Sequence, residues 1–122
     1  MADLPDITSS WETRYGLECL CIEVADRGSY LRADFNPRTQ NFSIEGFYVL
    51  TPHVGLGKEL LRQTEREARE IGAARLVAII TSAECLASMT TVFGEEHITI
   101  THQGNYSQEN TRARLILPLV PA

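Results

Sequence analysis

Hydrophobic and polar residues alternate with a period of two through the first half of the chain. The alternation predicts three strands, over residues 17–25, 30–35 and 41–50, because successive side chains of a strand point to opposite faces. Turn-forming residues at 26–29 and 36–39 separate these strands. Strands joined by such short turns form an antiparallel meander.

The period changes to that of a helix at Leu56, and apolar residues then return every three or four positions up to Ile71. Gly72 suits the end of this helix, since glycine readily adopts the left-handed backbone that follows many helices. Residues 76–80 are continuously apolar, which predicts a strand that is buried on both faces. Strand, helix and strand over 41–81 make a βαβ unit, so the third and fourth strands should run parallel.

The rest of the chain is predicted to form a second helix and two strands. The helix covers residues 83–93 and stops at Gly94, and the strands cover 97–102 and 111–117. Pro118 either ends the last strand or confines it to a sheet edge, because proline donates no backbone hydrogen bond.

The first sixteen residues are polar and rich in turn formers. Within them, residues 9–12 match a capping box, which predicts a short helical turn that extends to about Tyr15. We treat residues 1–16 as the N-terminal segment of one domain over residues 1–122, because a chain of this length supports a single core.

Composition and charge argue against several function classes. The formal net charge is −5, and the arginines around Arg66 alternate with glutamates on the first long helix, so we expect no nucleic-acid partner. No apolar run approaches the ~20 residues that cross a bilayer, and the N-terminus has no secretory signal. The three cysteines do not pair evenly, and the three histidines have no metal-ligand spacing. We therefore expect a cytoplasmic protein with reduced thiols, no metal site and no membrane contact.

Two glycines, Gly55 and Gly57, flank Leu56 where the third strand gives way to the first long helix. Such a turn leaves backbone N–H groups unpaired at a helix N-terminus, where the helix dipole also favours an anion. One interpretation is that this turn holds a phosphate or pyrophosphate. The alternative is that the glycines only allow a tight turn against the sheet.

The element order βββ-α-β-α-ββ and the glycine turn resemble the GNAT N-acetyltransferase superfamily over about residues 17–120. Residues 49–52 (Val-Leu-Thr-Pro) lead to 54–57 (Val-Gly-Leu-Gly), and the helix that follows carries Leu60, Leu61, Ala68, Gly72, Ala73 and Ala74. The resemblance implies an α+β fold with a mixed, twisted sheet and reduced N-terminal helices. It also implies a CoA-ester-dependent N-acyltransferase, with acetyl-CoA as co-substrate and an amine acceptor on a small molecule or a protein.

The resemblance assigns cofactor-binding roles to particular residues. The pyrophosphate would contact the turn and the helix start, which comprise Val54, Gly55, Leu56, Gly57 and Lys58. The pantetheine arm would lie along Val49 and Leu50, although apolar strand residues at these positions would be buried in any fold. Ser82 stands at the mouth between the fourth strand and the second helix, where the family often has asparagine. Its simpler interpretation is a helix N-cap.

Glu45 is the candidate for the base that deprotonates the amine. It is opposite in parity to Phe42, Ile44 and Tyr48, in the region where some members of the family keep a catalytic glutamate. The alternative is an exposed residue on the polar face of the strand. Tyr48 shares the apolar parity, so we expect it in the core rather than in the site.

Three departures from the family pattern support a second hypothesis. Pro52 stands where the family has arginine or glutamine, and Thr90 occupies the position of the tyrosine that often protonates the departing thiolate. About sixteen residues precede the first predicted strand, whereas the family usually has two helices there that shape the acceptor pocket. The alternative is a non-catalytic GNAT-like module that regulates or inhibits a protein partner.

Both faces of the first predicted strand are largely apolar. One face carries Leu17, Cys19 and Cys21, and the other carries Leu20, Ile22 and Val24. Because the N-terminal helices that would cover such a sheet are reduced, we expect the protein to form a homodimer.

Overall fold

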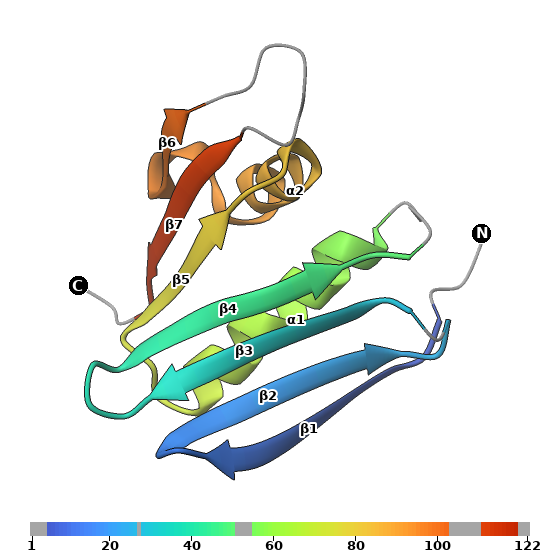
Figure 1. Cartoon of the computed structure of the whole chain (residues 1–122), viewed down its shortest axis with the longest axis vertical. Coiled ribbons are helices and arrows are strands. Elements are labelled where there is room, and N and C mark those ends of the chain that lie inside the picture. The colour runs from blue at the N-terminus through green and yellow to red at the C-terminus, as the bar shows by residue number, and fades with distance from the viewer. Residues whose placement is uncertain (1–4, 27, 51–54, 103–110, 120–122) are drawn as a thin grey trace.

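The computed structural model describes residues 5–26, 28–50, 55–102 and 111–119. These residues form a seven-stranded sheet, two α-helices and one short 3-10 helix (Figure 1). The strands are β1 (Ile7–Arg14), β2 (Leu17–Val24), β3 (Tyr30–Asn36), β4 (Asn41–Tyr48), β5 (Arg75–Ile80), β6 (Ile98–His102) and β7 (Arg112–Pro118). The helices are α1 (Leu56–Glu70) and α2 (Ala83–Phe93), and the short helix η1 (Glu95–His97) precedes β6.

The strands lie in the order β1-β2-β3-β4-β5-β7-β6, and every neighbouring pair is antiparallel except β4 and β5. The parallel pair expected from the sequence is therefore confirmed, as is the α+β class with a mixed sheet. The expected glycines, Gly72 and Gly94, stand at the ends of the two helices. Their φ angles of 84° and 98° lie in the region that favours glycine. Pro118 ends β7, which lies between β5 and β6 rather than at an edge.

The N-terminal segment forms the strand β1, so the predicted helical turn was wrong. β1 pairs with β2 along all eight of its residues. Tyr15 and Gly16 join the two strands, and their φ angles of 52° and 78° are those of a type I′ hairpin turn. Strand pairing over this length outweighs the weak local preference of a capping box, which explains the error.

Both helices cover the same face of the sheet. Helix α1 contacts β3, α2 contacts β7, and the two helices contact each other. The core between them contains Leu20, Ile22, Leu31, Phe42, Leu60, Leu61, Leu76 and Leu115, which are at most 1% exposed. Trp11 extends the packing onto β1, because its Nε1 donates a 2.9 Å hydrogen bond to Glu67 on α1 and its ring meets Phe42 edge-on.

The other face of the sheet, called the open face below, is not covered by either helix. The prediction that β5 is buried on both faces was therefore wrong. Leu76, Ala78 and Ile80 are buried toward the helices, whereas Ile79 is 73% exposed on the open face. The continuous apolar run of β5 thus places part of its hydrophobic surface where a ligand or partner can reach it.

A β-bulge interrupts the pairing of β3 with β4. Arg32 pairs with Gly46, and the next residue, Ala33, pairs with Ile44. Glu45 is therefore the extra residue of the bulge, and it bends and twists β4 at this point.

The bulge reverses the side-chain alternation of β4. Beyond it, Phe47 packs against the core, and Tyr48 is 48% exposed. Leu50, just after the strand, is 46% exposed. The expectation that Tyr48 and Leu50 lie in the core was therefore wrong, because a period of two cannot register one inserted residue.

Candidate functional site

β4 and β5 separate at the bulge. Their parallel pairing runs from Asn41 and Arg75 to Ile44 and Ala78, and then it stops. Figure 1 shows the two strands diverging toward their C-terminal ends. Within the described strands, the edge of β4 that faces β5 is thus unpaired over residues 45–48. Backbone N–H and C=O groups on such an edge remain available to an extended ligand.

Three hollows follow this gap. The inner hollow, of about 560 Å³, lies between the end of β4 and the first turns of α1 and α2. The neck, of about 140 Å³, lies between the diverging strands, and the outer hollow, of about 570 Å³, opens on the open face. The neck shares Phe47 and Cys85 with the inner hollow, and it shares Glu45, Ile79 and Thr81 with the outer one. A passage therefore leads from the start of α1 to the open face.

The glycine turn stands at the inner end of the passage. Gly55 is the N-cap of α1, with φ 97°, and no side chain caps the helix there. Gly57 lines the inner hollow, and a Cβ added to it would lie 3.5 Å from Phe47 and Val49, which is ordinary van der Waals contact. Packing therefore does not require glycine at position 57, although the turn requires it at position 55.

The first turn of α1 reaches the inner hollow through Gly57, whereas Gly55, Leu56 and Lys58 do not line it. The first N–H groups of α1 lack intrahelical acceptors, and the helix dipole favours an anion beside them. Leu56 is buried and holds the turn on the core, while Lys58 is half-buried in the same turn. Val54, the remaining residue proposed for the pyrophosphate, lies outside the described residues.

Val49 and Leu50 both line the inner hollow, as expected for residues beside a pantetheine arm. The N–H group of Leu50, however, already donates a 2.8 Å hydrogen bond to Ser29 Oγ. Ser29 is buried, and its hydroxyl donates in turn to Asp26 at 2.6 Å. This network fixes the end of β4 to the turn between β2 and β3, so the unpaired edge at residues 45–48 is the better backbone ligand.

Glu45 lies where the neck meets the outer hollow, and its side chain is exposed. It has no hydrogen-bond or ion-pair partner among the described residues. Tyr48 lines the inner hollow on the other side of the neck, with its ring 6.2 Å from that of Tyr30. The carboxylate and the phenol therefore stand at opposite ends of the passage.

The start of α2 forms the wall that faces β4. Ser82 Oγ accepts a hydrogen bond from the Cys85 N–H at 3.1 Å, so Ser82 is the N-cap of α2 and also lines the passage. Burial raises the pKa of the Cys85 thiol to about 11, and it stays protonated at neutral pH. Thr90 is not directed at the site, because its hydroxyl donates to the Leu86 carbonyl at 2.7 Å.

Sequence reasoning missed Phe47, Thr81, Cys85 and Ser88 as lining residues of the passage. Phe47 reaches it only because of the bulge. Cys85 and Ser88 are three apart on α2, which is the spacing of one helix face. The helical period alone could have shown that Cys85 and Ser88 share one face of α2. It could not have shown that this face lies against the end of β4.

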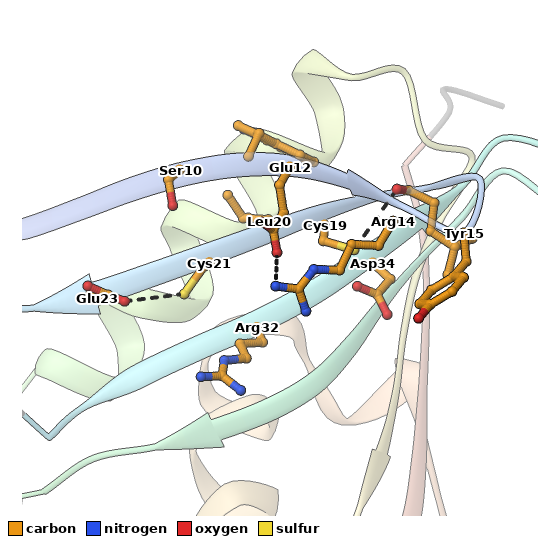
Figure 2. Close-up of a pocket in the computed structure, with 12 residues that line it drawn as sticks. Ser10, Glu12, Arg14, Tyr15, Cys19, Leu20, Cys21, Glu23, Arg32 and Asp34 are labelled. Atoms are coloured by element: carbon orange, nitrogen blue, oxygen red, sulfur yellow. Dashed lines mark hydrogen bonds and ion pairs between the residues drawn. The ribbon is translucent and has the colours of Figure 1, made fainter.

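A further hollow, of about 760 Å³, lies elsewhere, on the open face of β1, β2 and β3 (Figure 2). It shares no lining residue with the passage. Figure 2 shows Arg14 paired with Glu12 and the Cys21 thiol directed at Glu23. Burial raises the pKa of Cys19, and the adjacent Asp34 carboxylate raises it further, so this thiol is a weak nucleophile.

Neither a metal site nor a membrane span is found in the described part of the chain. No group of three or more His, Cys, Asp or Glu side chains there is placed to hold a metal ion. Neither α1 nor α2 is long and apolar enough to cross a bilayer.

The architecture matches those of solved acetyltransferases. An acetyltransferase from Bacillus subtilis, solved in complex with CoA, is 18% identical with a TM-score of 0.64, over 97% of this chain and 100% of that one. The ribosomal-protein-S18-alanine N-acetyltransferase from Escherichia coli is 15% identical with a TM-score of 0.58, over 90% of this chain and 74% of that one. The IAA acetyltransferase from Bacillus cereus is 18% identical with a TM-score of 0.56, over 85% and 79%.

No family model and no curated protein matches the sequence. The structural matches nevertheless confirm the GNAT N-acetyltransferase-like fold that the sequence indicated.

Proposed function

We propose that the protein binds acetyl-CoA, or another CoA ester, and transfers its acyl group to an amine. The observation that carries this proposal is the passage from the N-terminus of α1, through the gap between β4 and β5, to the carboxylate of Glu45. A ligand with an anionic head, an extended amide-containing arm and a reactive end fits this passage. Its head corresponds to the N-terminus of α1, its arm to the gap, and its reactive end to the region of Glu45. The solved Bacillus subtilis acetyltransferase with bound CoA supports the choice of ligand.

Each part of the cofactor has a counterpart along the passage. The pyrophosphate lies at the N-terminus of α1, beside Gly55 and Gly57. The pantetheine amides pair with the unpaired edge of β4 over residues 45–48. The thioester then lies in the neck, and the acceptor amine approaches from the outer hollow.

The chemistry removes two protons from the acceptor nitrogen and returns one to the departing thiolate. Glu45 takes a proton from the ammonium of the acceptor, the amine nitrogen attacks the thioester carbonyl, and the C–S bond breaks as the C–N bond forms. The CoA thiolate departs toward the inner side of the neck. The protonated thiol of Cys85 lines that side and can donate a hydrogen bond to the thiolate.

Titration calorimetry with acetyl-CoA tests the proposal. The wild type should bind, and Gly57→Glu should bind at least about tenfold more weakly, because it places bulk and negative charge beside the pyrophosphate. Ala87→Glu is the matched control, since Ala87 is exposed on α2 and does not line the passage. No heat from the wild type at millimolar acetyl-CoA would refute the proposal.

A second candidate function is a non-catalytic module that binds a protein partner. It is favoured by the connection between β1 and β2, which is a two-residue hairpin and contains no helix. In the described chain, therefore, no helix covers the open face beside the outer hollow. Binding of CoA with acetyl transfer supports the enzyme, and binding without transfer supports a CoA sensor. Neither binding nor transfer supports the interaction module.

A further inference from the structure

The outer hollow contains two charged side chains of opposite sign, and they do not pair with each other. Glu45 stands on β4 at the mouth of the neck, and Arg114 stands on β7. Neither has a hydrogen-bond or ion-pair partner among the described residues. Arg75, in contrast, is held by Asn41 and the Thr39 carbonyl at 2.8 and 2.9 Å. Among the described residues, Arg114 is therefore the arginine of this hollow whose side chain has no partner, and it can bind a ligand there.

An apolar floor separates the two charges. β5 lies between β4 and β7, and its Val77 and Ile79 stand opposite Ile116 and Arg114 in the sheet register. Ile79 is 73% exposed and Ile116 is 46% exposed, so the floor is open to a ligand. Two strand spacings amount to roughly 10 Å, and the backbones of β4 and β7 are farther apart than this at Glu45 because β4 has diverged from β5 there; two long side chains narrow that span.

From this arrangement we infer that the acceptor is a small α-amino acid with an apolar side chain, an inference that rests on the proposed function. Its ammonium group meets Glu45, its carboxylate meets the guanidinium of Arg114, and its side chain lies on Ile79 and Ile116. The guanidinium can bind a carboxylate through two parallel hydrogen bonds, which distinguishes an amino acid from an amine without an acid group.

The reaction on this acceptor balances without another reagent. The ammonium loses one proton to Glu45, which passes it to solvent, and the amine nitrogen forms a bond to the acetyl carbonyl carbon. The C–S bond of acetyl-CoA then breaks, the nitrogen gives up its second proton, and the CoA thiolate takes up one proton. The products are an N-acetyl amino acid, CoA and one released proton, and Arg114 holds the carboxylate throughout.

Equilibrium binding of three related ligands tests the inference without need of turnover. Leucine carries both charges, leucinamide lacks the carboxylate, and 4-methylpentanoate lacks the amine. By NMR titration of the wild type, leucine should bind at least about tenfold more tightly than either analogue. Arg114→Gln should weaken leucine binding about tenfold and leave leucinamide binding unchanged. Arg62→Gln, on the exposed side of α1, should behave as the wild type.

Three results would overturn the inference: equal affinity for leucine and leucinamide, equal loss of both in Arg114→Gln, or no leucine binding at high millimolar concentration. These titrations are run with and without CoA, so they stand apart from the calorimetric test of acetyl-CoA. If acetyl-CoA binds and amines are acetylated with no preference for leucine, only the acceptor is wrong. If acetyl-CoA does not bind, the proposed function itself is wrong.

Discussion

At the scale of single residues, one inserted amino acid has the largest consequence. Glu45 is the extra residue of the bulge, the first residue of β4 that no longer pairs with β5, and the carboxylate between the neck and the outer hollow. An insertion at this point separates the strands and also places an acid beside the opening. The same residue thus shapes the site and supplies its candidate base.

Replacing Glu45 by Gln should keep the shape of the bulge and remove the carboxylate. We expect acetyl-CoA affinity to stay close to that of the wild type and turnover to fall about 10²–10⁴-fold, the usual effect of losing a general base. The rise of the wild-type rate with pH should be absent from the variant. Steady-state kinetics over a range of pH measure both. An unchanged kcat with an unchanged pH profile would show that Glu45 is only a solvated strand residue.

The Cys85 thiol should make stability depend on alkaline pH. Its folded-state pKa of about 11 lies above the unfolded value of 9.0, so folding favours the protonated form. The resulting stability is complete below pH 9 and is lost as pH rises toward 11, by about 2 kcal/mol. Urea denaturation of the wild type and Cys85→Ala should show their difference in unfolding free energy shrinking over this range. A constant difference would contradict the raised pKa.

At the scale of elements, periodicity predicted most of the fold. It located α1, α2 and six of the strands to within about two residues, because amphipathic patterns and glycine stops follow directly from backbone geometry. It missed β1, whose polar residues show little alternation of hydrophobicity at the sheet edge. It also missed the bulge, since one inserted residue leaves no signature except a change of parity.

Deleting Glu45 should separate the role of the bulge from that of the carboxylate. The pairs of Ala33 with Ile44 and of Arg32 with Gly46 would then follow in a regular register. We expect a folded protein with an unchanged or higher Tm, a closed gap beside β5, and acetyl-CoA binding weakened at least about tenfold. Thermal denaturation and calorimetry measure these effects, with Glu45→Gln as the control that keeps the bulge. Binding at wild-type affinity would show that the bulge does not create the cofactor site.

The hairpin between β1 and β2 can be stabilised at Tyr15. Its side chain is fully exposed, and its φ of 52° is unfavourable for a residue other than glycine, asparagine or aspartate. Tyr15→Asn should therefore raise the free energy of unfolding by about 0.5–1 kcal/mol, because Asn-Gly is a preferred type I′ pair. Gly16→Ala, at φ 78°, should lower it by about 1 kcal/mol. If urea denaturation gave both variants the same free energy of unfolding as the wild type, this account would be contradicted.

At the scale of the whole molecule, the two helices cover one face and leave the other open. The sequence indicated the glycine turn, Ser82 and Glu45 as separate points along the chain. It could not show that one gap joins them, because that depends on where β4 leaves β5 and on which face α2 occupies. Arg114 had no sequence signal at all, since its partner across the hollow is on a strand almost seventy residues earlier.

Because the helices cover only one face of the sheet, the structure also specifies which face should form the expected homodimer. Leu20, Ile22 and Val24 are buried under α1, so only the face with Leu17, Cys19 and Cys21 remains for association.

This face is half-buried and carries charges of both signs, among them Arg14, Glu12 and Asp34, which suits contact with a second copy of itself. Sedimentation at high micromolar concentration should show a dimer. Cys21→Arg should shift it to monomer, and Ala87→Arg, on the exposed side of α2, should not. Because this face shares no lining residue with the outer hollow, the Cys21→Arg monomer should also keep wild-type affinity for acetyl-CoA. A wild type that stays monomeric would show that the open face is left to solvent and ligand alone.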